Sequence, residues 1–152
     1  MDKPKKAANS WNIAATHGLI AGFIIPFMIN AAGGFLMGFL LPESILANVL
    51  IMVTLAFILI IISIYFGVIY SAKYLNKKYI IKNKTKVINL STIFTAIITF
   101  IIHGVGYYLN NSPLTSQGMA ISFISLLTTI ILFYVLSYKY VNQTYQITQL
   151  KT

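Results

Sequence analysis

The sequence predicts an all-α, polytopic membrane protein in which four transmembrane helices form two antiparallel hairpins and a small bundle. Of its 152 residues, 58% are hydrophobic and only 9% are charged. A soluble domain carries about 25% charged residues, because its surface must be wetted. Four apolar stretches are also long enough to cross about 30 Å of hydrocarbon, which takes about 20 helical residues. Lipid must therefore be the solvent for most of this surface, and a disordered chain is excluded.

The first predicted span covers about residues 11–41 and follows three lysines. A cleaved signal peptide would share the basic start. However, this apolar stretch is longer than the core of a signal peptide, and the cleavage site at Ala31, Ala32 and Gly33 is weak. We therefore expect the segment to be retained as a membrane span.

The remaining spans are predicted at about residues 45–70, 87–109 and 118–138, within a single domain of residues 1–152. A tight turn at Pro42 joins the first pair, and a short polar loop at 110–117 joins the second. A longer basic loop (71–86) connects the two hairpins, and a tail (139–152) follows the last span. We expect the second and fourth spans to be mainly lipid-facing or filler helices, anchored by Tyr and Lys.

Lysine placement predicts the orientation. The chain has eleven lysines and no arginine; they precede the first span, fill the basic loop or follow the last span. The positive-inside rule then predicts that both termini and the basic loop lie in the cytoplasm. We expect the membrane to be the cytoplasmic membrane of a bacterium. The net charge of +9 is thus explained without nucleic acid as a partner.

The lysines of the basic loop are also candidates to bind anionic lipid headgroups of the bilayer, each contributing about 1 kcal/mol of attraction near the surface. The alternative is that they serve only to set the topology. The candidates are Lys73, Lys77, Lys78, Lys82, Lys84 and Lys86.

Small or polar residues recur at every fourth position of the first span. Close helix packing in membranes uses such spacing, and Pro26 should kink the helix. Each four-residue step drifts about 40° around a helix, so one neighbour cannot contact the whole series. We expect one half to pack against one neighbour and the other half against another, with Asn30 bonding a carbonyl freed by Pro26. The series is Ala14, Gly18, Gly22, Pro26, Asn30, Gly34 and Gly38.

The third span carries a polar stripe with the same spacing. Such a stripe can line a proton path or a solute cavity. Alternatively, its hydroxyl groups bond carbonyls of their own helix. The stripe is Ser91, Thr95, Thr99, His103 and Tyr107.

No catalytic or metal-binding set can be assembled, so we expect no enzyme, metal or cofactor. The only carboxylate side chains, Asp2 and Glu43, lie outside the spans, and the chain has no cysteine. His17 and His103 should differ by roughly 15 Å in depth, too far for a shared metal. His17 is expected at the membrane interface, as a headgroup-contacting or packing residue.

One pattern is repeated 66 residues apart. Ser71-x-Lys73-Tyr74-x-Asn76-x-x-Tyr79 follows the second span, and a matching pattern from Ser137 to Tyr145 follows the fourth. A duplicated hairpin would produce this repeat. So would the ordinary use of Lys, Tyr and Asn at the inner ends of helices, and both explanations remain open.

Two functions from different classes fit the sequence. The small-residue series and short loops favour a structural or accessory subunit that packs as a homo-oligomer or within a larger membrane complex. The polar stripe favours an oligomeric channel or small-solute transporter lined by the first and third spans.

Overall fold

The prediction of an all-α bundle of four membrane-spanning helices is confirmed by a computed structural model of the chain. The structure describes the backbone of residues 6–109 and 116–149, with side chains of 6–105 and 118–142. Helices long and apolar enough to cross a membrane cover Ser10–Leu40, Val49–Lys78, Lys84–Val105 and Gly118–Asn142. The elements in order are β1 (Lys6–Ala7), α1 (Ser10–Leu19), the π-helical turn η1 (Ile20–Ile24), α2 (Ile25–Leu40), α3 (Glu43–Leu46), α4 (Val49–Lys78), β2 (Tyr79–Ile80), α5 (Lys84–Leu109) and α6 (Ser116–Gln149).

The second and fourth helices end later than the predicted spans, so the basic loop is much shorter than residues 71–86. The second span also begins later than the predicted residue 45, at Val49, because Glu43–Leu46 form the separate short helix α3. The helix α4 continues through Lys78, and the α6 backbone remains helical to Gln149. Lysine is a good helix former, and Lys77 and Lys78 in the last turn of α4 complement its dipole. Asn83 then caps α5 by accepting a hydrogen bond from the Lys86 backbone N–H at 2.9 Å. Only residues 79–83 lie between the two helices.

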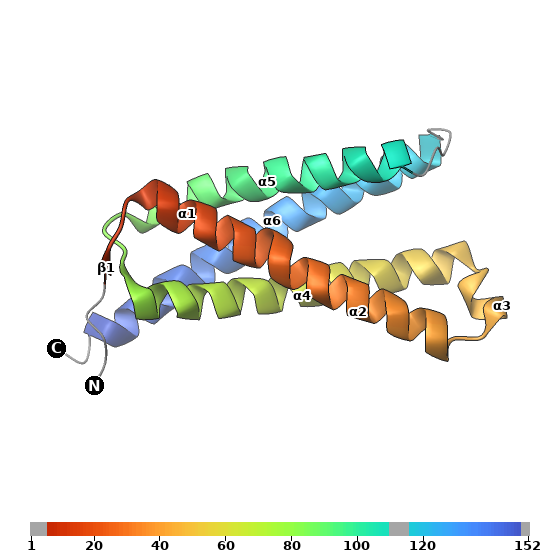
Figure 1. The fold of residues 1–152 in the computed structure, drawn as a ribbon, viewed down its shortest axis with the longest axis horizontal. Helices are drawn as coiled ribbons and strands as arrows, with labels where there is room; N and C mark the ends of the chain where they lie inside the picture. The colour runs from red at the N-terminus through yellow and green to blue at the C-terminus, as the bar shows by residue number, and fades with distance from the viewer. Residues whose placement is uncertain (1–5, 110–115, 150–152) are drawn as a thin grey trace.

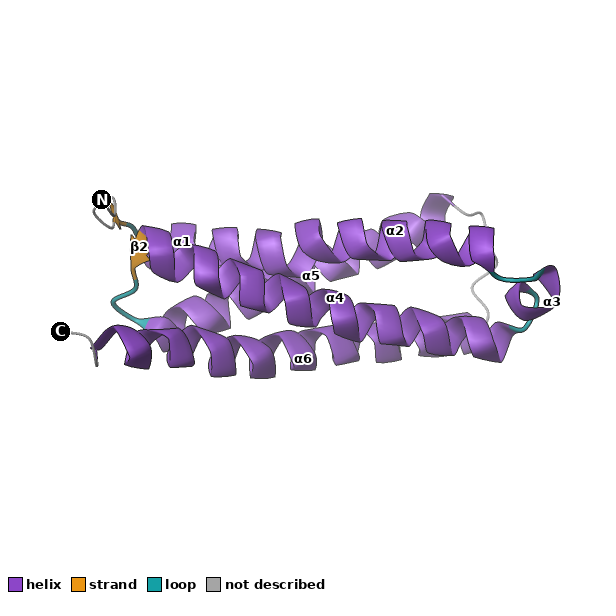
Figure 2. Ribbon diagram, turned by 90° about the horizontal axis from the view of Figure 1, so that it is seen from below, coloured by secondary structure: helices purple, strands orange, loops and turns teal. Residues whose placement is uncertain are grey.

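The strands β1 and β2 form a small parallel bridge, with Lys6 opposite Tyr79 and Ala7 opposite Ile80. This bridge ties the segment before α1 to the connection between α4 and α5, at one end of the bundle (Figure 2). We call this the basic end. The opposite end, which carries α3, is the turn end.

The continuous path α1–η1–α2 crosses the bundle diagonally (Figure 1). Near the basic end, α1 packs along α5, whereas α2 packs along α4 towards the turn end. The helices α4 and α6 pack together more extensively than any other pair. The second and fourth spans are mainly lipid-facing, as expected, because only 11% and 17% of their most apolar stretches are buried. They are not mere filler, however, since they pack against each other and α4 also packs along the first span.

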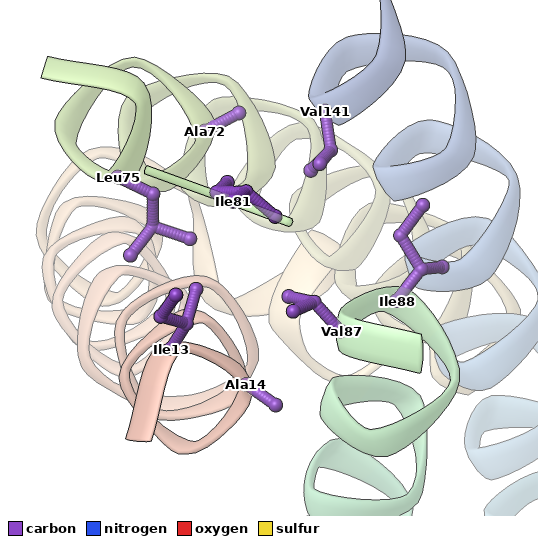
Figure 3. Close-up of a cluster of buried hydrophobic side chains, with 8 residues drawn as sticks. All are labelled: Ile13, Ala14, Ala72, Leu75, Ile81, Val87, Ile88 and Val141. Carbon is purple, nitrogen blue, oxygen red and sulfur yellow. The ribbon is translucent and has the colours of Figure 1, made fainter. Parts of the chain in front are cut away.

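The hydrophobic core is concentrated at the basic end. One cluster of buried side chains there joins all four spans to Ile81 of the α4–α5 connection (Figure 3). A second cluster, in the middle of the bundle, is formed by Ala21, Ile64, Val68 and Phe133. In α2, by contrast, Pro26 is the one fully buried residue. The bundle is thus tightly packed at the basic end and open towards the turn end, where the two hairpins diverge (Figure 1). The first cluster is Ile13, Ala14, Ala72, Leu75, Ile81, Val87, Ile88 and Val141.

Candidate functional site

His17 is a buried junction of three helices, so of its two expected roles the packing one is correct and the headgroup one is wrong. Its side chain is 0% exposed. The ring Nδ1 lies 2.8 Å from the Ser71 Oγ of α4, and Nε2 lies 3.0 Å from the Ser137 Oγ of α6. A neutral imidazole has one N–H donor and one acceptor nitrogen, so one serine accepts and the other donates. A buried polar ring in lipid needs both partners, which explains its position. We call these three residues the His17 cluster.

The two serines of the His17 cluster are equivalent positions of the 66-residue repeat. A four-residue spacing leads to each of them, through Ser63 and Gly67 in α4 and through Thr129 and Phe133 in α6. The Phe133 ring packs against His17, with ring centroids 5.3 Å apart. These two series were the missed signal, because each places its polar groups on one helix face.

The first half of the small-residue series packs on the polar stripe of α5. A Cβ atom on Gly22 would lie 2.5 Å from the Thr95 Oγ1, and one on Gly18 would lie 3.1 Å from the Ser91 carbonyl oxygen. Gly22 therefore needs glycine for the helices to approach so closely, whereas a side chain at Gly18 would make a tight contact that a small shift could relieve. The Thr95 hydroxyl fills the space that a Gly22 side chain would take, and it is buried without a hydrogen-bond partner among the described residues.

In the second half of the series, Asn30 contacts Ser63 of α4, whereas Gly34 and Gly38 do not pack inside the chain. A Cβ atom on Gly34 or Gly38 would meet nothing within 4 Å, and both residues are exposed. Gly33 is instead the glycine of α2 that packs against α4, because a Cβ atom on it would lie 2.8 Å from the Leu59 side chain. From Gly22 to Gly34 the series has drifted by about 120° around the helix, which turns it away from the bundle.

A π-helical turn, η1, lies where the sequence predicts a kink. The Ile25 N–H bonds the Ile20 carbonyl, five residues back, so the helix widens just before Pro26. This widening accommodates a proline ring that would otherwise press on the preceding turn. Asn30 then donates from Nδ2 to the Pro26 carbonyl oxygen at 2.7 Å and to the Ser63 Oγ of α4 at 3.2 Å.

A cavity of about 290 Å³ begins at η1 and continues beyond it, where the hairpins diverge. All four spans contribute to its lining. One part of the wall is apolar and includes Phe23, Phe27, Ile60 and Ile102. No charged residue is among the described residues that line it. The polar part of the wall consists of Asn30, Ser63, Thr99, His103, Ser125 and Thr129.

The polar stripe of α5 is divided between two environments. Ser91 and Thr95 are buried against α1 and η1, whereas Thr99 and His103 line the cavity. The His103 Nδ1 lies 2.8 Å from the Thr99 carbonyl oxygen, which can only accept, so Nδ1 carries the proton of this hydrogen bond. In the neutral ring Nε2 is then an acceptor. The Tyr107 side chain lies outside the described residues.

The candidate headgroup lysines lie around the basic end. Five of them are exposed, whereas Lys84 is partly buried. The Lys78 Nζ donates a hydrogen bond to the Tyr74 hydroxyl at 2.6 Å and lies 5.4 Å from the centre of the Tyr79 ring. In the part of the chain that the structure describes, no three His, Cys, Asp or Glu side chains are grouped as a metal site would require. The exposed lysines are Lys73, Lys77, Lys78, Lys82 and Lys86.

No protein-family model, curated protein or solved structure matches the chain. Its four long apolar helices mark it as a membrane protein. Two polar features of the bundle bear on its function, the closed His17 cluster and the open cavity.

Proposed function

We propose that the protein binds a small uncharged molecule in the cavity beyond η1 and acts as a carrier for it within the membrane. The cavity supports this proposal, because it joins a set of polar groups to an apolar wall at a level where the bundle is otherwise surrounded by lipid. Polar groups inside a membrane are costly unless they face a partner or a cavity. Each of the six polar side chains of the wall faces the cavity.

The absence of charge in the described lining limits the class of ligand. Asn30, Ser63, Thr99, Ser125 and Thr129 are neutral. An ion would lose its hydration without gaining a counter-charge, which costs several kcal/mol in a low-dielectric environment. Neutral molecules bear no such cost. The binding site lies within one chain, so this carrier differs from the oligomeric channel that the sequence also allowed.

Thiol protection tests the proposal, since the natural chain has no cysteine and an introduced thiol is unique. Ser125→Cys places a near-isosteric thiol in the cavity wall. We expect catechol or 1-naphthol, two uncharged probes, to slow its reaction with N-ethylmaleimide in nanodiscs. At a concentration ten times the dissociation constant the rate should fall about tenfold.

The matched control is Thr54→Cys on α4, which is exposed and remote from the cavity lining. Its reaction rate should be the same with and without probe, because a probe bound in the cavity does not cover it. Slowing by probe that is merely dissolved in the bilayer would affect both thiols alike. Protection of Ser125→Cys by neither probe, or equal slowing of both thiols, would contradict the proposed function.

An accessory role is the second candidate, and the outward-facing glycines of α2 favour it. Gly34 and Gly38 are separated by one helical turn, are exposed and have no neighbour within 4 Å of a built Cβ. Such a pair lets another helix approach closely in lipid. The partner would be a second copy of the chain or a subunit of a larger complex.

Mass measurement of the intact particle in mild detergent tests this second role. We expect the wild-type particle to exceed the 16.9 kDa of one chain, and Gly34→Leu to reduce it to that mass. Gly104→Leu is the matched control, because Gly104 is also exposed with nothing within 4 Å, but lies on α5. A single-chain wild-type particle would remove this candidate.

A further inference from the structure

We propose that the cavity takes a lipid-soluble, uncharged molecule with a hydrogen-bond donor such as a hydroxyl group, which enters sideways from the bilayer between α2 and α5. This inference rests on the proposed function and specifies its ligand and its route. Four features support it: the divergence of the helices, the rim of the cavity, the closure of the basic end and the chemistry of the polar wall.

The divergence of α2 from α5 leaves the side of the bundle open. The helix α5 packs along α1 and η1, but it makes no extensive contact with α2 in the described residues. The diagonal path of α1–η1–α2 carries α2 to α4 instead (Figure 1). Along the first span the cavity is lined from Gly22 to Asn30, which is the stretch over which α2 leaves α5.

The rim of the cavity faces the surroundings of the bundle. Phe27 of α2 is 65% exposed and Ile102 of α5 is 45% exposed, although both line the cavity. Both belong to helices long and apolar enough to cross a membrane, so acyl chains surround them. A lipid-soluble molecule can therefore reach the polar wall without leaving hydrocarbon.

Among the described residues, the basic end offers no comparable route. The Thr95 side chain fills the notch at Gly22, and the Ala21 backbone packs against Gly67. The His17 cluster lies beyond them, since Ser71 is eight residues or about 12 Å along α4 from Ser63 in the cavity wall. These contacts separate the cavity from water at that end.

The polar wall offers acceptors whose own donors are already used. Asn30 directs Nδ2 at Pro26 and Ser63, which leaves its Oδ1 as the acceptor. His103 uses Nδ1 on its own helix, which leaves the Nε2 lone pair. A ligand that donates a hydrogen bond matches both groups, and a cavity of about 290 Å³ has roughly twice the volume of one that holds benzene.

Fluorescence quenching tests the route. A bimane label on Ser125→Cys reports on the cavity, and one on Ser71→Cys reports on the closed basic end. We expect phosphatidylcholine with brominated acyl chains to quench the first label at least twice as strongly as the second. Aqueous iodide should quench neither. Strong iodide quenching at position 125 together with no effect of brominated lipid would overturn sideways access.

Three naphthalene probes test the ligand class by thiol protection of Ser125→Cys. 1-Naphthol has the donor, 1-methoxynaphthalene keeps the oxygen without it, and 1-naphthalenesulfonate is charged. Since one net hydrogen bond corresponds to about a three- to tenfold change in affinity, 1-naphthol should bind about that much better than the methoxy compound. The sulfonate should give no protection. In His103→Leu the preference for 1-naphthol should shrink towards equal binding.

The outcomes separate the two levels of the proposal. Equal protection by 1-naphthol and 1-methoxynaphthalene leaves solute binding intact and overturns the donor requirement. Protection by catechol alone keeps the carrier and overturns a lipid-soluble ligand. If no probe protects although brominated lipid quenches, acyl chains fill the cavity, and both the carrier and its ligand class are wrong.

Discussion

Replacing Gly67 by alanine is expected to lower the free energy of unfolding by about 3 kcal/mol, at the upper end of the range for overpacked cores. The added Cβ would lie 2.7 Å from the Ala21 carbonyl oxygen and 3.1 Å from the Ala21 Cα. Both atoms are backbone, so no side-chain rotation relieves the contact, and α4 must move away from η1. Reversible unfolding in mixed micelles of dodecyl maltoside and sodium dodecyl sulfate, followed by circular dichroism, measures the loss.

The same substitution at Gly34 is the matched control, because a Cβ there meets nothing within 4 Å. Alanine is the better helix former by about 1 kcal/mol in water, so Gly34→Ala should leave stability unchanged or slightly raised. If the two alanine variants unfold alike, the contact between Ala21 and Gly67 is not tight.

The second large effect is expected for His17→Ala, at about 3 kcal/mol. The substitution removes two hydrogen bonds and leaves a void beside Phe133, and void formation in a packed core costs about 2 to 5 kcal/mol. Ser71→Ala and Ser137→Ala should each cost only about 0.6 kcal/mol, the usual size of an interhelical hydrogen bond in a membrane, with an upper limit near 1.7 kcal/mol.

Double-mutant cycles in the same unfolding assay separate the two hydrogen bonds of His17. The bond to Ser71 lies within the first hairpin, whereas the bond to Ser137 joins the two hairpins. We expect coupling of roughly 0.5 kcal/mol or more for each pair. Thr54→Ala provides the reference, because Thr54 is exposed and bonds its own helix at Leu50, so it should be additive with His17→Ala. Additivity for both serines would contradict the His17 cluster.

The four spans could be predicted because lipid imposes length and apolarity on each helix separately. The local bonds of Asn30 and His103 also follow from sequence, since a side chain four residues after a carbonyl can reach it. Gly18 and Gly22 could be assigned to a packed face, because small residues four positions apart share one side of a helix.

Contacts between distant spans could not be predicted in this way. Spacing shows which residues of a helix share a face, but not which helix that face meets. The equivalent roles of Ser71 and Ser137 required knowing that both helices converge on His17. The outward turn of Gly34 depends on the drift of α2 relative to α4, and the cavity depends on where α2 separates from α5.

The bridge between β1 and β2 has a consequence for the order in which the bundle forms during synthesis. Lys6 pairs with Tyr79, so the first hairpin can close on itself as soon as that residue is available, with His17 already beside Ser71. Ser137 is made 66 residues after Ser71, which at 5 to 20 residues per second is a delay of about 3 to 13 s. Throughout that interval one nitrogen of His17 lacks its final partner. The early hairpin therefore has its backbone pairing but lacks one hydrogen bond of His17, and α6 supplies the missing hydroxyl group when it packs.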